Sequence, residues 1–316
     1  MKVDISRFAC PICEGNTFHP YKLGLVRCSV CHVVVSPSIW EPGANSMMEE
    51  EFFGENYISS SSVWVDLFES WNNTKTLARI ARSHSPGHRL LEIGVGSGSF
   101  LNAARDAGYE VTGCDLSTPI CRQVRHKYDI PMHNAPLTTL IGKNHFDAIV
   151  MNHVLEHTNQ PIELLRGVEQ LLTSDGLLHI AVPNIACWEA TLSGWVSYEP
   201  YHLTYFTPQT LEKAISASGL EPISFFTYDS FSGWFLALLR TALGANRAGG
   251  VVSRSEDSPI ERVKHRSIIA EHAYRIAMVL FGGVIWPLRW LQSKLGYGDE
   301  IICIAHRQQF RSTPLL

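Results

Sequence analysis

The chain has 316 residues, of which 45% are hydrophobic and 18% are charged, with a formal net charge of −4. This composition is typical of a globular protein with room for one large domain and attachments, and the charge gives no electrostatic reason to expect a nucleic-acid partner. Residues 1–7 carry charge and form no apolar segment, so we expect no signal peptide. Cysteines scattered along such a chain predict reduced thiols and a cytoplasmic location, and peripheral attachment to the membrane is a second possibility.

The N-terminal residues 1–36 contain two C-x2-C pairs separated by fourteen residues, Cys10 with Cys13 and Cys28 with Cys31. This spacing is typical of a zinc ribbon, in which four thiolates surround one tetrahedral ion. Four protein ligands leave no open coordination position, so we expect a structural and not a catalytic zinc. Free or redox-active thiols are the alternative, and His19 and His32 are expected to be bystanders.

Residues 37–88 are predicted to be a linker followed by N-terminal cap helices. The first part is rich in Pro, Ser and Glu but includes Phe52, Phe53 and Tyr57, which either pin the linker or carry it across the mouth of the next domain. From 63 to 82, apolar residues recur at roughly helical spacing and predict a helix. They are Val63, Leu67, Trp71, Leu77 and Ile80.

Strands and helices alternate through the core of the chain. Near-continuous apolar strands between amphipathic helices predict an α/β fold, a doubly wound parallel sheet covered on both faces. A ligand is expected beyond the carboxyl ends of its strands, where the first strand turns into a helix. The predicted strands are 90–93, 108–115, 131–133, 146–152 and 177–182, and the helices are 98–107, 119–128 and 161–172.

The C-terminal part predicts an aromatic-rich loop at 188–206, a helix at 208–219, and strands at 220–228 and 300–306. Between these strands, residues 229–297 are expected to form a helical insertion. Its uncharged run at 276–288 is thirteen residues long, too short to cross a bilayer, and includes Pro287. We expect these helices to pack on the core or on a partner chain, as in a homodimer, with shallow membrane contact as the alternative.

The first strand ends in a glycine turn, where Gly94, Gly96 and Gly98 follow Glu92 at alternate positions. Glycines at a strand-to-helix turn let a ligand approach the backbone closely. A dinucleotide site would place its third glycine at position 99, which is Ser99, and this disfavours an NAD-type oxidoreductase. Asp115 ends the second strand, where a carboxylate can accept hydrogen bonds from both hydroxyls of a ribose.

Residues 89–183 closely resemble the class I S-adenosylmethionine-dependent methyltransferases. The segments that carry the resemblance are 91–98 (LEIGVGSG), 113–117 (GCDLS) and 146–157 (FDAIVMNHVLEH), similar to the first, second and fourth motifs of that family. Residues 201–208 and the following helix are similar to a bacterial methyltransferase-domain subgroup found in sugar, polysaccharide and natural-product pathways. The resemblance implies a seven-stranded Rossmann-like sheet with an antiparallel last strand, formed by residues 89–228 and 298–310.

The resemblance also implies which residues contact S-adenosylmethionine. Glu92 and the three glycines would contact its methionine part, Asp115 its ribose, and Asn134 or Ala135 its adenine, and Leu116 is also expected to contact the cofactor. Asn152 and His153 would line the sulfonium end.

Methyl transfer is an in-line displacement, so the protein needs mainly to align the acceptor and exclude water. A hydroxyl acceptor would profit from a base, and we name His202, His157 and His153 as candidates for it. Each has a structural alternative, since His157 can hold the loop through Glu156 and His202 can hold the aromatic loop.

The expected acceptor is a small molecule of sugar or natural-product type, with O-methylation favoured and the aromatic loop indicating an apolar or ring-bearing group. A non-catalytic zinc-ribbon adaptor that only binds ligand is the alternative function of a different class.

Overall fold

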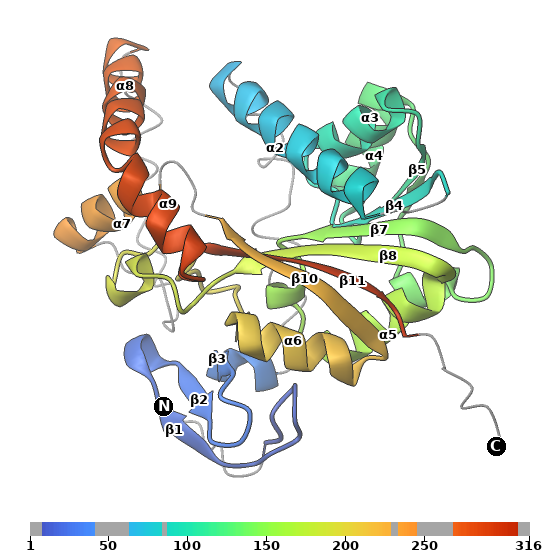
Figure 1. The fold of residues 1–316 in the computed structure, drawn as a ribbon, viewed down its shortest axis with the longest axis horizontal. Helices are drawn as coiled ribbons and strands as arrows, with labels where there is room; N and C mark the ends of the chain where they lie inside the picture. The colour runs from blue at the N-terminus through green and yellow to red at the C-terminus, as the bar shows by residue number, and fades with distance from the viewer. Residues whose placement is uncertain (1–7, 42–62, 84–86, 229–232, 245–267, 309–316) are drawn as a thin grey trace. The chain divides into compact units, whose positions relative to one another are not determined.

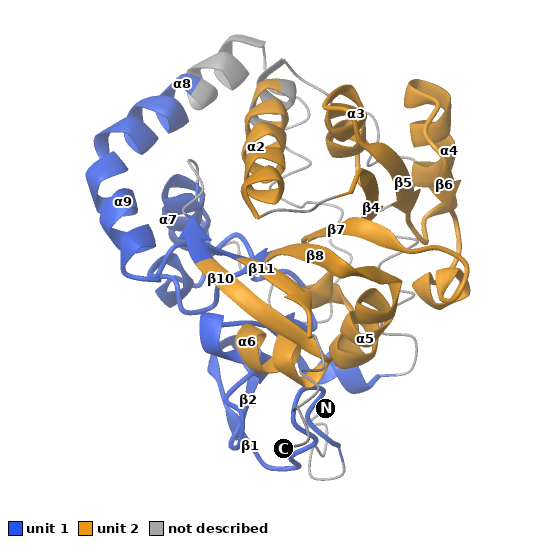
Figure 2. Cartoon of the chain, turned by 45° about the vertical axis from the view of Figure 1, so that its right-hand side comes forward, with its two compact units in different colours: residues 1–41, 182–210, 226–302 blue, residues 42–181, 211–225, 303–316 orange. Residues whose placement is uncertain are grey.

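The computed structural model describes residues 8–41, 63–83, 87–228, 233–244 and 268–308 (Figure 1). They belong to two compact units, shown in Figure 2. Unit 1 comprises residues 1–41, 182–210 and 226–302, and unit 2 comprises residues 42–181, 211–225 and 303–316. Phe52, Phe53 and Tyr57 lie outside the described residues, so the two predictions made for them stay predictions.

A seven-stranded sheet with the order β10-β11-β8-β7-β4-β5-β6 dominates unit 2. The pairs β4–β5, β4–β7, β5–β6 and β7–β8 are parallel. This confirms the predicted α/β, doubly wound, Rossmann-like fold. The strands are β4 (Arg89–Ile93), β5 (Glu110–Cys114), β6 (Met132–His133), β7 (Phe146–Asn152), β8 (Leu172–Pro183), β10 (Leu220–Tyr228) and β11 (Glu300–Arg307).

Helices cover both faces of this sheet: α2, α3 and α4 lie on one side and α5 and α6 on the other (Figures 1 and 2). Both faces are therefore apolar, and β7 is buried from Phe146 to Met151. The helices and 3-10 turns are α2 (Val63–Arg82), α3 (Ser99–Asp106), α4 (Thr118–Tyr128), η5 (Leu137–Leu140), η6 (Leu155–His157), α5 (Pro161–Leu171) and α6 (Pro208–Ala217).

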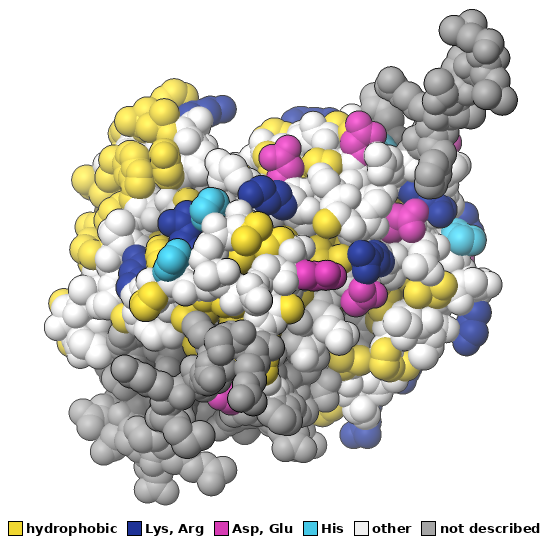
Figure 3. All heavy atoms as spheres, turned by 90° about the horizontal axis from the view of Figure 1, so that it is seen from below, with side chains coloured by type: hydrophobic (Ala, Val, Ile, Leu, Met, Phe, Trp, Pro, Cys, Tyr) yellow, Lys and Arg dark blue, Asp and Glu magenta, His cyan; other side chains and the backbone are white. Residues whose placement is uncertain are grey.

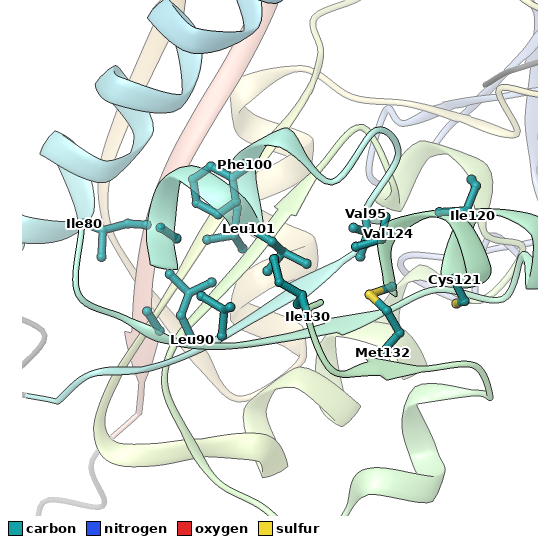
Figure 4. Packing of buried hydrophobic residues seen from close by; sticks show 14 of the residues in the cluster. Ile80, Leu90, Val95, Phe100, Leu101, Ile120, Cys121, Val124, Ile130 and Met132 are labelled. Carbon is teal, nitrogen blue, oxygen red and sulfur yellow. The ribbon is translucent and has the colours of Figure 1, made fainter. Parts of the chain in front are cut away.

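The core between the sheet and α2, α3 and α4 is apolar and fully buried. Figure 4 shows Leu90 of β4 with Leu101 and Val124 of the helices. Val150 and Leu177 of the neighbouring strands belong to the same cluster. Burying side chains of this size contributes about 1.5–3 kcal/mol each to the hydrophobic stabilisation. This packing holds the carboxyl ends of β4 and β5, where the glycine turn and Asp115 lie, in a fixed arrangement.

Two predicted elements of unit 2 differ in detail. The helix over 63–82 is present, but of its predicted apolar positions Ile80 is fully buried, whereas Leu67 and Trp71 are exposed. The strand predicted at 177–182 begins earlier, at Leu172. Its pairing with β7 is irregular at this end: Phe146 pairs with Leu172, whereas Ala148, two residues later, pairs with Leu177, five residues later.

Unit 1 contains an antiparallel sheet with the order β1-β2-β3-β9. Its last strand comes from the aromatic loop, since β9 pairs with β3 through Val34 opposite Tyr205 and Val35 opposite Thr204. The elements are β1 (Phe18–Pro20), η2 (Lys22–Gly24), β2 (Val26–Cys28), β3 (Val34–Val35), η3 (Pro37–Trp40), η7 (Glu189–Thr191) and β9 (Thr204–Tyr205).

The buried core of this unit joins the ribbon to the aromatic loop. Leu25 and Val34 of the ribbon pack with Trp195, Tyr198 and Tyr205 of the loop. Lys22 extends the contact, because its ammonium donates to the carbonyl of Ala190 and lies 5.4 Å from the centre of the Tyr198 ring. The ribbon and the loop therefore share one core.

The described part of the insertion consists of α7 (Gly233–Ala242), α8 (Ile268–Val284) and α9 (Trp286–Lys294). Within the predicted helical insertion, the uncharged run at 276–288 is broken between α8 and α9 at Ile285, and Pro287 occupies the first turn of α9, where its missing N–H costs nothing. Residues 276–284 and 286–294 meet at an angle of 60°.

Candidate cofactor and metal sites

The glycine turn connects β4 to α3 through three residues with left-handed backbone. Gly94, Gly96 and Gly98 have φ values of 73°, 53° and 76°. At Gly94 space is limiting as well, since a Cβ would lie 2.3 Å from Cγ2 of Val154. Gly98 also provides no side-chain cap for α3. The turn therefore presents bare backbone to a ligand at the start of a helix.

Asp115 ties this turn to the loop after β5. Its Oδ2 accepts a hydrogen bond from the Val95 amide at 2.9 Å, and its Oδ1 accepts one from the Ser117 amide at 2.8 Å. Burial raises the pKa of Asp115, while these backbone donors lower it. A carboxylate oxygen has more than one lone pair, so both oxygens retain capacity for the hydroxyls of a ribose.

Glu92 is the most unusual side chain of the turn. It is only 4% exposed, and its Oε2 has no hydrogen-bond partner among the described residues. Burial raises its pKa well above the ordinary value, and the charges of Asp115 and Glu69 raise it further. A buried carboxyl without a partner is costly, so the arrangement would be stabilised by a ligand that brings a positively charged amino group.

Two residues of α2 that the sequence reasoning missed also reach the turn. The Ser97 hydroxyl donates to Oε2 of Glu69 at 3.0 Å, and Nδ2 of Asn73 donates to the Ser99 hydroxyl at 3.2 Å. Glu69 and Asn73 are four residues apart and so lie on one face of the helix. That spacing was visible in the sequence, but nothing in it indicated that this face meets the glycine turn.

The residues predicted beside adenine support the loop after β5. Nδ2 of Asn134 donates to the carbonyls of Asp115 and Leu116, each at 3.0 Å, and its Oδ1 accepts from the Thr118 hydroxyl at 2.8 Å. The carbonyl of Ala135 accepts from the Cys114 thiol at 3.6 Å. Leu116 is 53% exposed, which makes it an apolar side chain on this loop that a base could cover.

At the end of β7, two predicted histidines lie on either side of one buried carboxylate. Nδ1 of His153 is 3.2 Å from Oε1 of Glu156, and Nε2 of His157 is 3.9 Å from the same oxygen. Glu156 is 1% exposed, whereas the His153 side chain is 51% exposed. His153 has a φ of 54°, and Oδ1 of the preceding Asn152 lacks a partner within the described residues.

The third candidate base, His202, belongs to unit 1. Its Nδ1 donates to the carbonyl of Ser197 at 2.7 Å, since a carbonyl can only accept. A neutral His202 therefore carries its basic lone pair on Nε2. The ring lies edge-on to Tyr201 and Tyr205, with centroids 5.2 and 6.0 Å away. The hydrogen bond to Ser197 also holds the aromatic loop, as the structural alternative expected.

The four predicted metal ligands come together in unit 1. All four Sγ atoms lie within 4.8 Å of one another, with Cys10 and Cys31 at 3.5 Å and Cys13 and Cys28 at 3.6 Å. Zinc–sulfur bonds of 2.3 Å in a tetrahedron place the sulfurs about 3.8 Å apart. All eight cysteines are free thiols. The donor set and its spacing fit a zinc ion.

The two C-x2-C turns have the same backbone hydrogen bonds. Cys10 donates to the carbonyl of Gly15 and accepts from the amide of Glu14. Cys28 donates to Val33 and accepts from His32 in the same way. Glu14 and His32 both have left-handed backbone, with φ of 61° and 69°. We call residues 10–15 and 28–33 the two knuckles.

Comparison with known proteins shows similarity to methyltransferases. A family model described as a methyltransferase domain matches residues 66–224. The chain is 28% identical over 109 residues to the ubiquinone biosynthesis O-methyltransferase of Haemophilus ducreyi, which covers 31% of this chain and 46% of that protein. It is 30% identical over 127 residues to the protein of the same description from a Caulobacter species, covering 36% and 50%.

The chain spans about half the length of the curated relatives it matches. Among solved structures, it is similar to a SAM dependent methyltransferase from Archaeoglobus fulgidus, with a TM-score of 0.50 and 16% identity, covering 81% of this chain and 99% of that one. This likeness shows the fold.

Proposed function

The chain belongs to the methyltransferase-domain family, within the class I S-adenosylmethionine-dependent methyltransferases, and we propose that it transfers the methyl group of S-adenosylmethionine to a small-molecule acceptor. One observation carries the proposal. The buried carboxyl of Glu92, whose Oε2 has no partner among the described residues, lies beside a glycine turn that Asp115 holds from the next strand. That combination suits a ligand with an ammonium group and a ribose.

Each end of the ligand has residues suited to it. Glu92 would hold the ammonium of the methionine part, and Asp115 the ribose. Leu116 would cover adenine on the loop supported by Asn134 and Ala135. Asn152, whose Oδ1 has no partner among the described residues, and His153 would line the sulfonium end. When bound, S-adenosylmethionine supplies a methyl carbon activated by its sulfonium leaving group.

We propose an oxygen acceptor, because the relatives are described as O-methyltransferases. A hydroxyl must lose its proton as the new bond forms, and a neutral imidazole can take it. His153 is oriented by Glu156, His157 lies near the same carboxylate, and His202 is oriented by Ser197 with Nε2 as the basic nitrogen. The aromatic loop, residues 188–206, favours a ring-bearing acceptor of sugar or natural-product type.

We also propose that Cys10, Cys13, Cys28 and Cys31 hold a structural zinc ion. The four thiols supply every position of a tetrahedral site. The zinc would therefore stabilise the ribbon and, through the shared core, the aromatic loop.

Calorimetry with S-adenosylmethionine, S-adenosylhomocysteine and NAD tests the donor. We expect the first two to bind and NAD not to bind. Asp115→Ala should weaken the binding of S-adenosylmethionine at least about tenfold, since a charge-assisted hydrogen bond contributes about 1.5–3 kcal/mol. Wild-type affinity in this variant would contradict the ribose assignment, and no binding by the wild type would contradict the proposal as a whole.

Methyl transfer is then assayed across phenols, sugar nucleotides and lipid-linked sugars. Single His153→Asn, His157→Asn and His202→Asn variants identify the base, whose loss should lower kcat by about 10²–10⁴-fold without changing donor affinity. Donor binding without methyl transfer to any acceptor class would support the adaptor alternative.

A further inference from the structure

Helix α9 buries polar side chains and exposes apolar ones, the opposite of a typical surface helix. Its polar side chains Arg289 and Gln292 are 6% and 0% exposed. Its large apolar side chains point outward, with exposures between 42% and 59%. These are Trp286, Leu288, Trp290, Leu291 and Leu295, the last just beyond the end of the helix. A surface helix normally places its apolar residues inward, and an exposed apolar face of this kind is typical of an interaction site.

The buried amide of Gln292 makes three hydrogen bonds, and these fix the orientation of α9. Nε2 of Gln292 donates to Oε2 of Glu189 at 2.5 Å and to the carbonyl of Tyr297 at 2.7 Å. Its Oε1 accepts from Nε1 of Trp234 at 2.9 Å. Turning α9 over to bury its tryptophans would break these buried hydrogen bonds.

Helix α8 continues the apolar surface. Ile276, Val279, Leu280 and Val284 are exposed, and Val284 reaches 80%. Figure 3 shows hydrophobic side chains gathered at the left of the molecule, the side on which α7, α8 and α9 lie in Figure 1. We call the outward residues of α8 and α9 the apolar face.

Charge and aromatic content indicate what covers the apolar face. Between Glu271 and Asp299 the sequence has no acidic residue, and Lys294 of α9 is an exposed basic residue, whereas Arg289 is buried. Tryptophans with both an apolar body and an N–H, such as Trp286 and Trp290, are typical of the boundary between lipid headgroups and acyl chains. A tryptophan-bearing apolar face with an exposed lysine and no acidic residue in the same stretch complements an anionic lipid surface.

The lengths of the helices indicate whether they would cross a bilayer or lie on its surface. No single helix in the described part of the chain is long and apolar enough to cross a membrane, and the pair 276–284 and 286–294 that passes the test together is bent by 60°. We propose that the apolar face docks on the surface of an anionic lipid bilayer, with α8 and α9 lying in the interface.

The test is flotation of the full chain with vesicles. The probes are phosphatidylcholine vesicles and vesicles of phosphatidylcholine mixed with phosphatidylglycerol. We expect the chain to float with both and more strongly with the anionic ones. Leu280→Ser combined with Trp290→Ser should reduce the bound fraction at least about tenfold, since each change removes a large apolar side chain from the lipid. Lys294→Glu should reduce binding to the anionic vesicles only.

The matched control is Ile223→Ser, which removes an equally exposed apolar side chain from β10 and should float like the wild type. Light scattering on the same samples gives the oligomeric state. The proposal is overturned if the wild type floats with neither vesicle, or if the double variant floats as well as the wild type. A dimer that the double variant converts to a monomer, without flotation of either, would make the apolar face a protein interface instead.

Discussion

The two knuckles of the ribbon and the glycine turn of the sheet both require left-handed backbone, yet they meet the requirement with different residues. The knuckles place Glu14 and His32 in that conformation, and both side chains are exposed. The glycine turn uses glycine at every such position, and at Gly94 a Cβ would collide with Val154. A left-handed position in open space thus tolerates a side chain at modest cost, whereas one in a packed turn excludes it.

The largest expected effect follows from removing the group that holds the knuckles together. Treatment with a zinc chelator, or Cys28→Ser, should unfold the ribbon, because structural zinc contributes about 10 kcal/mol or more and so small a module has little core of its own. Hydrogen exchange at Val34 and Val35 and metal analysis measure this. Donor binding by the glycine turn serves as the control and should persist. About zero zinc in a chain with all four cysteines intact would contradict the metal assignment.

In the glycine turn, Gly94→Ala should cost several kcal/mol of unfolding free energy and abolish donor binding, because it adds a steric conflict with Val154 to the left-handed strain. Gly142→Ala is the matched control, since Gly142 has a φ of 77° with nothing within 4 Å of its Cβ position. It should cost about 1–2 kcal/mol and leave donor affinity unchanged. Equal losses in thermal or urea unfolding would mean that space is not limiting at Gly94.

The pH dependence of stability tests Glu92. Its pKa is raised in the folded state, so the folded chain keeps a proton that the unfolded chain loses. The contribution of Glu92 to the unfolding free energy should therefore be most favourable below its unfolded pKa and decrease as pH rises towards the folded pKa.

Glu92→Gln should remove this decrease and raise stability at neutral pH, by about 1.4 kcal/mol for every pH unit that separates the folded pKa from the unfolded one. It should also weaken binding of S-adenosylmethionine, because the neutral amide no longer attracts the ammonium group. Urea unfolding at several pH values and calorimetry supply both readouts. A variant less stable than the wild type at neutral pH would contradict the buried carboxyl with its raised pKa.

The smallest effect is expected in the knuckles. His32→Gly and Glu14→Gly relieve left-handed strain but add backbone entropy to the unfolded chain, so each should change the unfolding free energy of the ribbon by less than about 1 kcal/mol. Zinc affinity measured by competition with a chromophoric chelator should stay within about tenfold of the wild type. A large loss would show that these side chains, and not only their backbone, stabilise the knuckles.

The sequence was most informative where spacing alone determines geometry. Cysteines three residues apart predicted the four-thiol cluster, and glycines at alternate positions after an apolar strand predicted the turn. The parallel sheet followed from near-continuous apolar strands, because a strand buried on both faces has little room for polar residues.

Features that depend on contacts between distant segments were not predictable. The approach of Glu69 and Asn73 to the glycine turn depends on how α2 packs, which periodicity does not encode. The outward apolar face of α9 could not be told from a buried one, because a pattern shows which residues share a face but not which way that face points. Strand β9 has only two residues, too few to show alternation.

The pairing of β3 with β9 also has a consequence for how the chain folds. Its partners, Val34 with Tyr205 and Val35 with Thr204, lie about 170 residues apart in sequence, so forming the pair closes a very long loop. During synthesis the ribbon can take up its metal long before residue 204 exists, and β3 would then be an open edge available to other strands. We expect the metal-bound ribbon to act as a preformed template on which the aromatic loop docks late, a slow, non-local step that pulse-labelling hydrogen exchange at Tyr205 would detect.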